Sequence, residues 1–450
     1  MFYRQILKEL GNWASSSNRK PLILRGARQV GKTTAVNQFS AQFDEYIYLN
    51  LELKDDKELF TGIKNVEKLV EAVFFLKNKS YSKDKITLIF IDEIQFAPEA
   101  FNILRYFYES FPDLYVIAAG SMLESVFNSE ITFPVGRVEY MVLRPASFPE
   151  FLDAMNEKLA LTQLMNIPLN EFAFSKLISL FHTYALIGGM PEIVNNYSER
   201  KNLTDLKNIY ESLLASYIDD VEKYARNDSQ VHHLRHVINS AFSEAGKRIK
   251  YNGFGKSAYG SREMKEALRT LEKAMLLSVV HPQTKAVLPL IPDIKKSPRL
   301  HLLDTGLVNY SVGIQSEILK TDNLNSVYEG TMIEHLIGQE LLAQQFNALS
   351  GLNFWVREKK SSLAEVDFIV LFDSKLIPVE VKSGTEGRLK SLHLYMDEAP
   401  HNLSVRFYAG KPEIVLSKTP GGKDFYILNL PYFLASQLDN YLKWFVNEIL

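Results

Sequence analysis

A glycine-rich stretch near the amino terminus constrains this chain more than any other feature. It fits the pattern G-x-x-x-x-G-K-[ST] without deviation and reads Gly26-Ala27-Arg28-Gln29-Val30-Gly31-Lys32-Thr33-Thr34. The apolar run 21–24 precedes it, and helical spacing of apolar residues follows it from Thr33. This order predicts a phosphate-binding loop, because two glycines let the backbone fold tightly with its N–H groups pointing inward. All nine residues are therefore predicted to line a nucleotide site.

Two side chains of this loop have specific predicted roles. Lys32 is expected on the β- and γ-phosphates, and the hydroxyl of Thr33 is expected to bind Mg²⁺. The positive end of the following helix dipole would face the same anion. ATP and Mg²⁺ are therefore the expected cofactors.

Two acids follow a second apolar strand, residues 86–91. We expect Asp92 to complete the Mg²⁺ shell and Glu93 to polarise the attacking water. The alternative is that both acids only end a strand in solvent.

Two further polar residues are candidates for the same site. Ser121 ends the buried strand 115–120 and would point at the γ-phosphate if that strand lies between the other two. Otherwise it is a turn serine. Arg137 could reach the transferring phosphoryl group from this subunit or from a neighbour, or it could be a surface arginine.

Four runs carry a family resemblance that covers most of the chain: LILRGARQVGKTT, LIFIDEIQ, VIAAGSMLESV and PVGRVEYMVLRPASFPEFL. In order and spacing they resemble the AAA-type ATPases of bacteria and archaea that carry a C-terminal domain of unassigned function. The stretch ALIGGMPEIV at 185–194 is similar to that family's motif after the ATPase core. The resemblance implies an α/β core with a parallel sheet and a helical lid. It also implies functional roles for Lys32, Thr33, Asp92, Glu93, Ser121 and Arg137.

Residues 229–298 show the order of helices, turn and strand that suits a winged helix. The segment 244–273 holds eight basic and four acidic residues, an excess that could meet DNA phosphates. The alternative is a solvated helix with ordinary charges.

The stretch EVDFIVLFDSKLIPVEVKSG, residues 365–384, predicts two antiparallel strands. With a two-residue turn at Ser374-Lys375, Asp367 faces Lys382 and Glu380 lies one diagonal away on the same face. A three-residue loop would put Asp367 on the opposite face, so the register decides this prediction.

These residues resemble the PD-(D/E)XK nuclease superfamily, with Asp367 and the E-x-K pair on the matching positions. Asp367 and Glu380, with Glu334 from the preceding helix, would bind Mg²⁺ or Mn²⁺, and Lys382 would stabilise the developing charge. Such folds also serve as inactive binding domains. Pro378 predicts that its strand is an edge strand or is unpaired at that residue.

The composition and net charge of the chain limit its possible functions further. The net charge is −2 and there is no cysteine, which excludes disulfides, thiolate zinc sites and a cysteine nucleophile. With no run of 18 apolar residues, we expect a cytoplasmic protein without a membrane partner. Beyond ATP, the expected partners are DNA, a second copy or another protein.

We therefore predict an α/β protein of four parts: a P-loop ATPase core at 1–147, a helical lid and linker at 148–228, a winged-helix-like module at 229–298 and a restriction-endonuclease-like α/β domain at 299–450. The expected function is an ATPase whose nucleotide state controls the C-terminal domain, which would bind or cleave DNA. The alternative is an ATP-dependent signalling or scaffold switch with a catalytically inactive nuclease-like domain.

Overall fold

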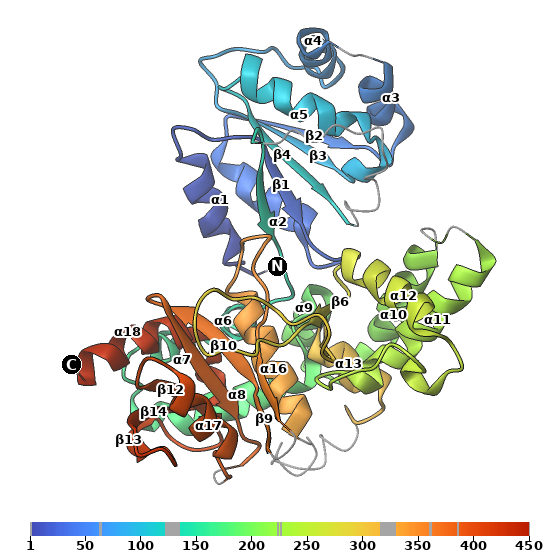
Figure 1. The fold of residues 1–450 in the computed structure, drawn as a ribbon. Coiled ribbons are helices and arrows are strands. Elements are labelled where there is room, and N and C mark those ends of the chain that lie inside the picture. Colours follow the sequence, from blue (N-terminus) through green and yellow to red (C-terminus); the bar gives the residue numbers. More distant parts are fainter. Residues whose placement is uncertain are drawn as a thin grey trace.

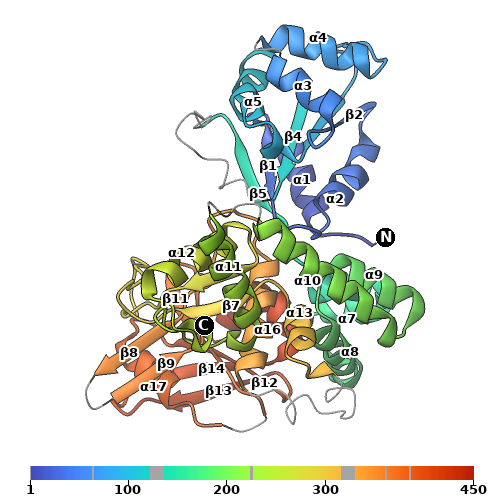
Figure 2. The same cartoon turned by 90° about the vertical axis from the view of Figure 1, so that its right-hand side faces the viewer.

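The computed structural model describes residues 2–62, 65–121, 136–222, 225, 227–315, 330–359, 362–384 and 387–449. Its elements gather into two lobes, seen one above the other in Figure 1 and again after a quarter turn in Figure 2. The upper lobe holds the first five strands and their helices. The lower lobe holds the rest of the chain.

The upper lobe is built on a five-stranded parallel sheet. Its strands are β1 (Leu22–Arg25), β2 (Glu45–Asn50), β3 (Thr87–Asp92), β4 (Tyr115–Gly120) and β5 (Glu139–Val142). Their order across the sheet is β2-β3-β4-β1-β5. The predicted parallel sheet is confirmed, and β4 lies between β1 and β3, which is the condition set for Ser121.

Helices cover both faces of this sheet, as a parallel sheet requires. They are α1 (Ile6–Ala14), α2 (Lys32–Phe39), α3 (Lys54–Gly62), α4 (Val66–Leu76) and α5 (Glu99–Ser110). Because side chains alternate along a strand, Leu22 and Leu24 of β1 pack with residues of α1 and α2, whereas Ile23 packs with residues of α3 to α5. The sheet therefore holds the carboxyl ends of its strands, where the loops emerge, at fixed positions.

The middle of the chain is mostly helical and belongs to the lower lobe (Figure 1). Its elements are α6 (Phe148–Ala154), α7 (Lys158–Leu164), α8 (Phe174–Ile187), α9 (Pro191–Arg200), α10 (Lys207–Glu222), α11 (Asp228–Ala241), α12 (Ser261–Lys273), β6 (Leu277–Val280), β7 (Arg299–Leu302) and α13 (Thr305–Ser311). Strands β6 and β7 pair in antiparallel fashion after the contacting helices α11 and α12. The pair of strands spans position 298, the predicted end of the winged-helix-like module. That module stays a prediction.

The last part of the chain forms a mixed sheet flanked by helices. Its elements are α16 (Gly330–Ala343), β8 (Trp355–Lys359), β9 (Ser362–Val366), β10 (Phe368–Phe372), β11 (Lys375–Val381), α17 (Lys390–Glu398), β12 (Leu403–Tyr408), β13 (Glu413–Lys418), β14 (Asp424–Pro431) and α18 (Leu438–Ile449). The sheet order is β10-β11-β12-β14-β13. Strand β11 is thus interior, and the edge-strand alternative for Pro378 is wrong. Its ladder with β12 begins at Val379, one residue after the proline.

The turn between β10 and β11 lies one residue earlier than predicted. Phe372 pairs with Lys375, so the two turn residues are Asp373 and Ser374, with φ of 46° and 58°. Two positive φ values suit the turn types that join antiparallel strands. Continuing the register puts Asp367 opposite Glu380 rather than Lys382. The shift moves the partner by two residues, so the predicted common face is retained.

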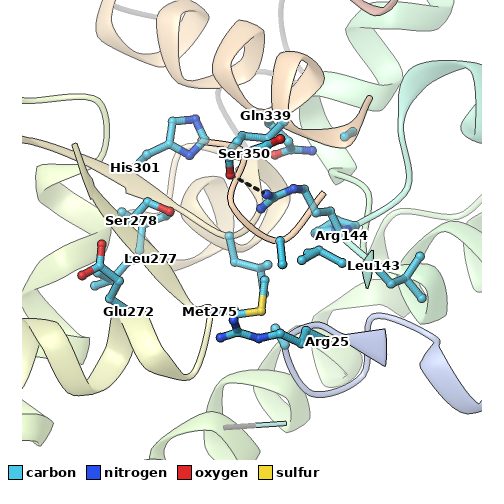
Figure 3. Close-up of a pocket in the computed structure, with 18 residues that line it drawn as sticks. Arg25, Leu143, Arg144, Glu272, Met275, Leu277, Ser278, His301, Gln339 and Ser350 are labelled. Carbon is cyan, nitrogen blue, oxygen red and sulfur yellow. Dashed lines mark hydrogen bonds between the residues drawn. The ribbon is translucent and has the colours of Figure 1, made fainter. Parts of the chain in front are cut away.

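A loop of the C-terminal part reaches the edge of the first sheet. The main-chain N–H of Val142 in β5 donates to the carbonyl of Phe346 at 2.8 Å, and Met141 forms a bridge with Asn347. Arg144 donates to the carbonyl of Ser350 at 3.3 Å, beside a cavity of about 190 Å³ (Figure 3). Burial lowers the pKa of Arg144 to about 10. The two lobes are therefore joined by main-chain pairing as well as by the connecting chain.

Candidate nucleotide-binding site

The glycine-rich loop has the conformation that its sequence predicts. Gly31 has φ of 93°, in the left-handed region, and caps the amino end of α2. A Cβ atom at Gly26 would lie 2.5 Å from the carbonyl oxygen of Leu143. Gln29 also adopts a positive φ, of 64°, which is a strained conformation for a residue with a side chain. Glycine is thus required at both ends of the loop.

Lys32 is buried in the first turn of α2. Its Nζ donates to the carbonyl oxygens of Gly26 and Ala27, both at 2.9 Å. Burial lowers the pKa of Lys32, and the carboxylates of Glu93 and Asp92 oppose that shift. The ammonium group is therefore held by neutral carbonyls inside the loop, beside the space that a phosphate would fill.

Thr33 and Asp92 meet as predicted. The Thr33 hydroxyl donates to Oδ2 of Asp92 at 2.7 Å, and the main-chain N–H of Glu93 donates to Oδ1 at 3.0 Å. The hydroxyl of Tyr48 also donates to Oδ2, at 3.2 Å. A hydroxyl and a carboxylate side by side are hard oxygen ligands, so this pair fits Mg²⁺. Tyr48 was missed, since a tyrosine in an alternating strand carries no signal of its own.

Glu93 follows Asp92 and turns into the site. Its φ of 53° is left-handed, and its Oε2 accepts a hydrogen bond from Gln95. Burial raises the pKa of Glu93. A carboxylate with a raised pKa is a better proton acceptor, which agrees with the predicted role of a general base.

A pocket of about 450 Å³ lies over this loop. Its walls are formed by Phe2, Arg4, Arg28, Gln29, Gly31, Lys32, Thr33, Thr34, Glu93, Pro191, Glu192 and Asn195. The last three belong to the first turns of α9, whose amino end lies below α2 in Figure 2. Of the predicted lid, α9 is the helix that meets the nucleotide pocket. The motif at 185–194 marks this segment in the sequence, but nothing in it indicates a contact with the P-loop.

Two arginines fasten the loop to its surroundings. Arg4 donates to the carbonyls of Val30 at 3.0 Å and Arg144 at 2.7 Å. Arg28 donates to Oδ1 of Asp220 on α10 at 2.7 Å. The phosphate-binding loop is thus tied to both the amino terminus and the helical segment.

The structure separates the two remaining candidates. Gly120 pairs with Arg25, the last residue of β1, so the buried Ser121 follows at the edge of the sheet where the loop lies. Arg137 precedes β5 and lies at the opposite edge, where its Nε is 3.2 Å from Glu109. Arg137 is therefore not brought to this chain's own pocket, and its action from a neighbouring copy stays a prediction.

Comparison with known families agrees with this geometry. Residues 18–152, which contain the loop, Asp92 and Glu93, match the family described as AAA domain. The chain carries an AAA-type P-loop ATPase domain. Residues 178–318 and 329–420, beyond this ATPase domain, match two families that are each described as a domain of unknown function.

Three solved structures show more distant similarity. A Walker-type ATPase of Pyrococcus abyssi is 16% identical over 69% of this chain and 96% of its own, with a TM-score of 0.44. The Orc1 protein of Aeropyrum pernix, solved in complex with DNA, is 12% identical over 71% and 94%, with a TM-score of 0.30. The RuvB Holliday junction branch migration motor of Thermotoga maritima is 12% identical over 62% and 90%, with a TM-score of 0.28. No curated protein matches the chain.

The four predicted residues of the C-terminal site gather at one place, around an arginine that the sequence did not single out. Arg299 of β7 lies 3.5 Å from Glu334 and 3.6 Å from Asp367 and also pairs with Glu365. Lys382 lies 2.5 Å from Glu380.

Burial dominates the titration of these acids. It raises the pKa of Asp367, and it raises the pKa values of Glu334 and Glu380 to about 8. Within the described ranges, no three acidic, histidine or cysteine side chains are arranged to hold a metal ion. As folded, the acids surround Arg299, and the predicted Mg²⁺ or Mn²⁺ site is not preassembled.

In the part of the chain that the structure describes, every helix is too short or too polar to cross a bilayer.

Proposed function

We propose that this chain hydrolyses ATP in the pocket above the P-loop and that the bound nucleotide controls the C-terminal part. The single observation that carries the proposal is the composition of that pocket. One wall is the P-loop with Glu93, and the other is the amino end of α9. A ligand that fills the pocket contacts both walls, so ligand binding would set the position of α9 relative to the P-loop.

The residues of the pocket divide the chemistry among them. Lys32 would exchange its two carbonyl partners for phosphate oxygens, and Thr33 with Asp92 would hold Mg²⁺. When bound, Mg²⁺ neutralises charge on the β- and γ-phosphate oxygens. Gln95 engages Oε2 of Glu93, and we assign Oε1 to the attacking water, whose proton Glu93 accepts.

The contacts behind α9 give a route to the C-terminal part. The main-chain N–H of Gly189, two residues before α9, donates to Oδ2 of Asp304 at 2.6 Å. Glu340 of α16 accepts from the main-chain N–H of Phe148 at 3.1 Å and from the hydroxyl of Tyr184. The lid is thus hydrogen-bonded to two elements of the C-terminal part through buried carboxyl groups.

We further propose that the C-terminal part is a nuclease-like domain acting on DNA. Support comes from the order α16, β8, β9, β10, β11, α17, β12, with Glu334 on the first helix and Asp367, Glu380 and Lys382 on the β10–β11 hairpin. As part of the same proposal, the basic residues of α12 would contact DNA phosphates.

A second function is favoured by one observation. Because Arg299 fills the acidic cluster, the domain in this state is suited to bind rather than to cleave. An ATP-dependent scaffold or signalling switch with an inactive nuclease-like domain would have the same arrangement of Arg299 and the acids. DNA affinity that falls steeply with salt supports a nucleic-acid partner, whereas no DNA binding supports the switch.

The test has two measurements. Phosphate release from ATP is compared for wild type, Lys32→Ala and the exposed control Lys57→Ala. Plasmid and branched DNA are then incubated with Mg²⁺ or Mn²⁺ and wild type or Asp367→Asn. Equal phosphate release in wild type and Lys32→Ala refutes the ATPase site, and DNA cleavage that persists in Asp367→Asn refutes the nuclease site.

A further inference from the structure

The position of Arg299 is the feature that the proposed function leaves unexplained. Its side chain is 8% exposed and lies with its guanidinium 4.8 Å from the ring centre of Phe354. Nη1 donates to the main-chain carbonyl of Asp367 at 3.1 Å and lies 3.5 Å from Glu334. Nη2 lies 3.6 Å from the Asp367 carboxylate. One guanidinium therefore joins a helix, a hairpin and β7.

The cluster around it lacks positive charge. Glu334, Glu365 and Asp367 all pair with Arg299, and Glu380 pairs with Lys382. With Arg248, which lies 3.6 Å from Glu365, four acids share three cations. Lys382 takes Oε1 of Glu380, while the buried Oε2 has no hydrogen-bond partner, and Glu380 is only 4% exposed. A buried carboxylate oxygen without a partner is costly, and a cation beside it would remove that cost.

We propose that Arg299 is a tethered cation that occupies the place of a divalent ion among Glu334, Asp367 and Glu380, and that ATP binding draws it out. This inference rests on the proposed function, since it names how the nucleotide would regulate the acidic site. The guanidinium is planar and carries one charge, and its nitrogens lie about 3.5 Å from the acids. A divalent ion carries two charges and binds carboxylate oxygens at roughly 2.0–2.6 Å. The two occupants exclude each other.

The connections of Arg299 point to the lid. Five residues after Arg299, the same segment reaches Asp304, which caps α13 and accepts the N–H of Gly189. Glu334 lies on α16, six residues or about 9 Å along the axis from Glu340, which binds the lid at Phe148. Arg299 and Glu334 thus sit on elements fastened to the lid.

The other two acids have a different attachment. Asp367 accepts the main-chain N–H of Val381 at 2.8 Å, within the hairpin, and Glu380 lies on β11 itself. A lid displaced by nucleotide would pull on Arg299, which would then give up its contacts with Asp367 of the hairpin. Loss of those contacts is what opens the cluster to a divalent ion.

The experiment locates bound metal directly. Fe²⁺ with ascorbate cuts the backbone beside a bound ion, and mass spectrometry maps the cuts, which separates the region of residues 367–380 from that of Asp92. Without nucleotide, wild type is expected to show no cut near 367–380, whereas Arg299→Met is cut there. Mn²⁺ should suppress those cuts by competition, and Arg299→Met combined with Asp367→Asn should lose them. Arg357→Met is the matched control, since Arg357 of β8 pairs with Glu398 at 3.4 Å, outside the cluster, and it should behave as wild type.

The second arm adds nucleotide. With a non-hydrolysable ATP analogue, wild type should be cut near 367–380 with metal affinity raised roughly tenfold, a typical coupling between two sites. Lys32→Ala should not respond. An uncut, well-folded Arg299→Met overturns the tethered-cation assignment, and wild type that is cut equally with and without analogue overturns the regulation.

Two further measurements separate a folding defect from a failure of the proposed function. If Arg299→Met does not fold by circular dichroism, Arg299→Gln takes its place, because glutamine removes the positive charge but keeps hydrogen-bond donors beside the acids. Absence of cuts in a well-folded Arg299→Gln then counts against the assignment. Phosphate release is measured on the same samples, so a failed ATPase with positive metal mapping refutes the proposed function alone.

Discussion

The P-loop and the acidic cluster each hold a buried basic side chain, but they hold it differently. Lys32 rests on two neutral carbonyls of its own loop, whereas Arg299 is gripped by charged groups from α16, the β8–β9 pair and the hairpin that follows. A carbonyl is easily exchanged for a phosphate oxygen, because a charged acceptor binds an ammonium more strongly. Carboxylates are not displaced so readily. The first site is therefore ready for its ligand, and the second is closed by its own residue.

The largest expected effect tests the ready site. Lys32→Ala should lower the rate of ATP hydrolysis about 10²-fold or more, because a donor aimed at the transferring phosphate is lost. Phosphate release and ATP binding by calorimetry are the measurements, with Lys57→Ala as control. Unchanged hydrolysis would show that the P-loop is not the site of ATP hydrolysis.

The next effect separates binding from chemistry in the same site. Glu93→Gln should keep ATP binding and lower hydrolysis by about 10²-fold, the usual contribution of a general base. Because burial raises the pKa of Glu93, the base form is lost as pH falls through that raised pKa. The wild-type rate should therefore begin to fall at a higher pH than an ordinary carboxylate would give. A rate profile that is flat down to the usual glutamate range contradicts this assignment.

A smaller effect tests the joint between the two sites. A Cβ on Gly306 would lie 2.0 Å from the carbonyl oxygen of Ile187, so Gly306→Ala should lower the free energy of unfolding by about 1–3 kcal/mol. Gly351→Ala is the control, since its added Cβ meets nothing within 4 Å. Chemical denaturation measures both. Equal stability of the two variants would mean that the lid and α13 are not held as closely as described.

The smallest effect concerns pH and the same joint. Burial raises the pKa of Glu340 to about 7 from an ordinary 4.5. The folded state therefore binds this proton more tightly than the unfolded state, and the contribution to stability is lost as pH rises from about 4.5 to about 7.

Replacing Glu340 by glutamine isolates the pH-dependent contribution of Glu340 to the free energy of unfolding. Compared with Glu340→Gln, wild type should lose stability between about pH 5 and about pH 8, as read from urea midpoints. The exposed Glu448→Gln should track wild type at both values. A midpoint difference between wild type and Glu340→Gln that does not change with pH would show that Glu340 titrates normally.

The two sites also differ in how far the sequence reveals them. The P-loop is contiguous, and Asp92 and Glu93 end a strand with an evident apolar pattern, so the parallel sheet and the position of the two acids beside the loop could be expected from the sequence. The roles of the two acids stay predictions. The turn of the hairpin was predicted one residue too late and its strand pairing two residues out of register, because Asp373 and Ser374 lack the glycine that marks such turns. Local patterns cannot show which distant side chain enters a cluster.

Arg299 illustrates that limit. In the sequence it is one arginine in a short apolar segment, without a motif around it. The structure shows that all four residues of this strand are buried, which is unusual for an arginine. Its acidic partners are more than thirty positions away in the sequence. The amino end of α9 was hidden for the same reason, since nothing local indicates that Pro191 faces the P-loop.

The pairing of Val142 with Phe346 has a practical consequence for anyone who shortens this chain. Strand β5 ends the first sheet, and the loop from the far end of the sequence shields it. Cut out alone, residues 18–152 would present a bare strand edge, a surface that invites stacking of one molecule on another. Fragments of this kind should precipitate where the intact polypeptide stays dispersed.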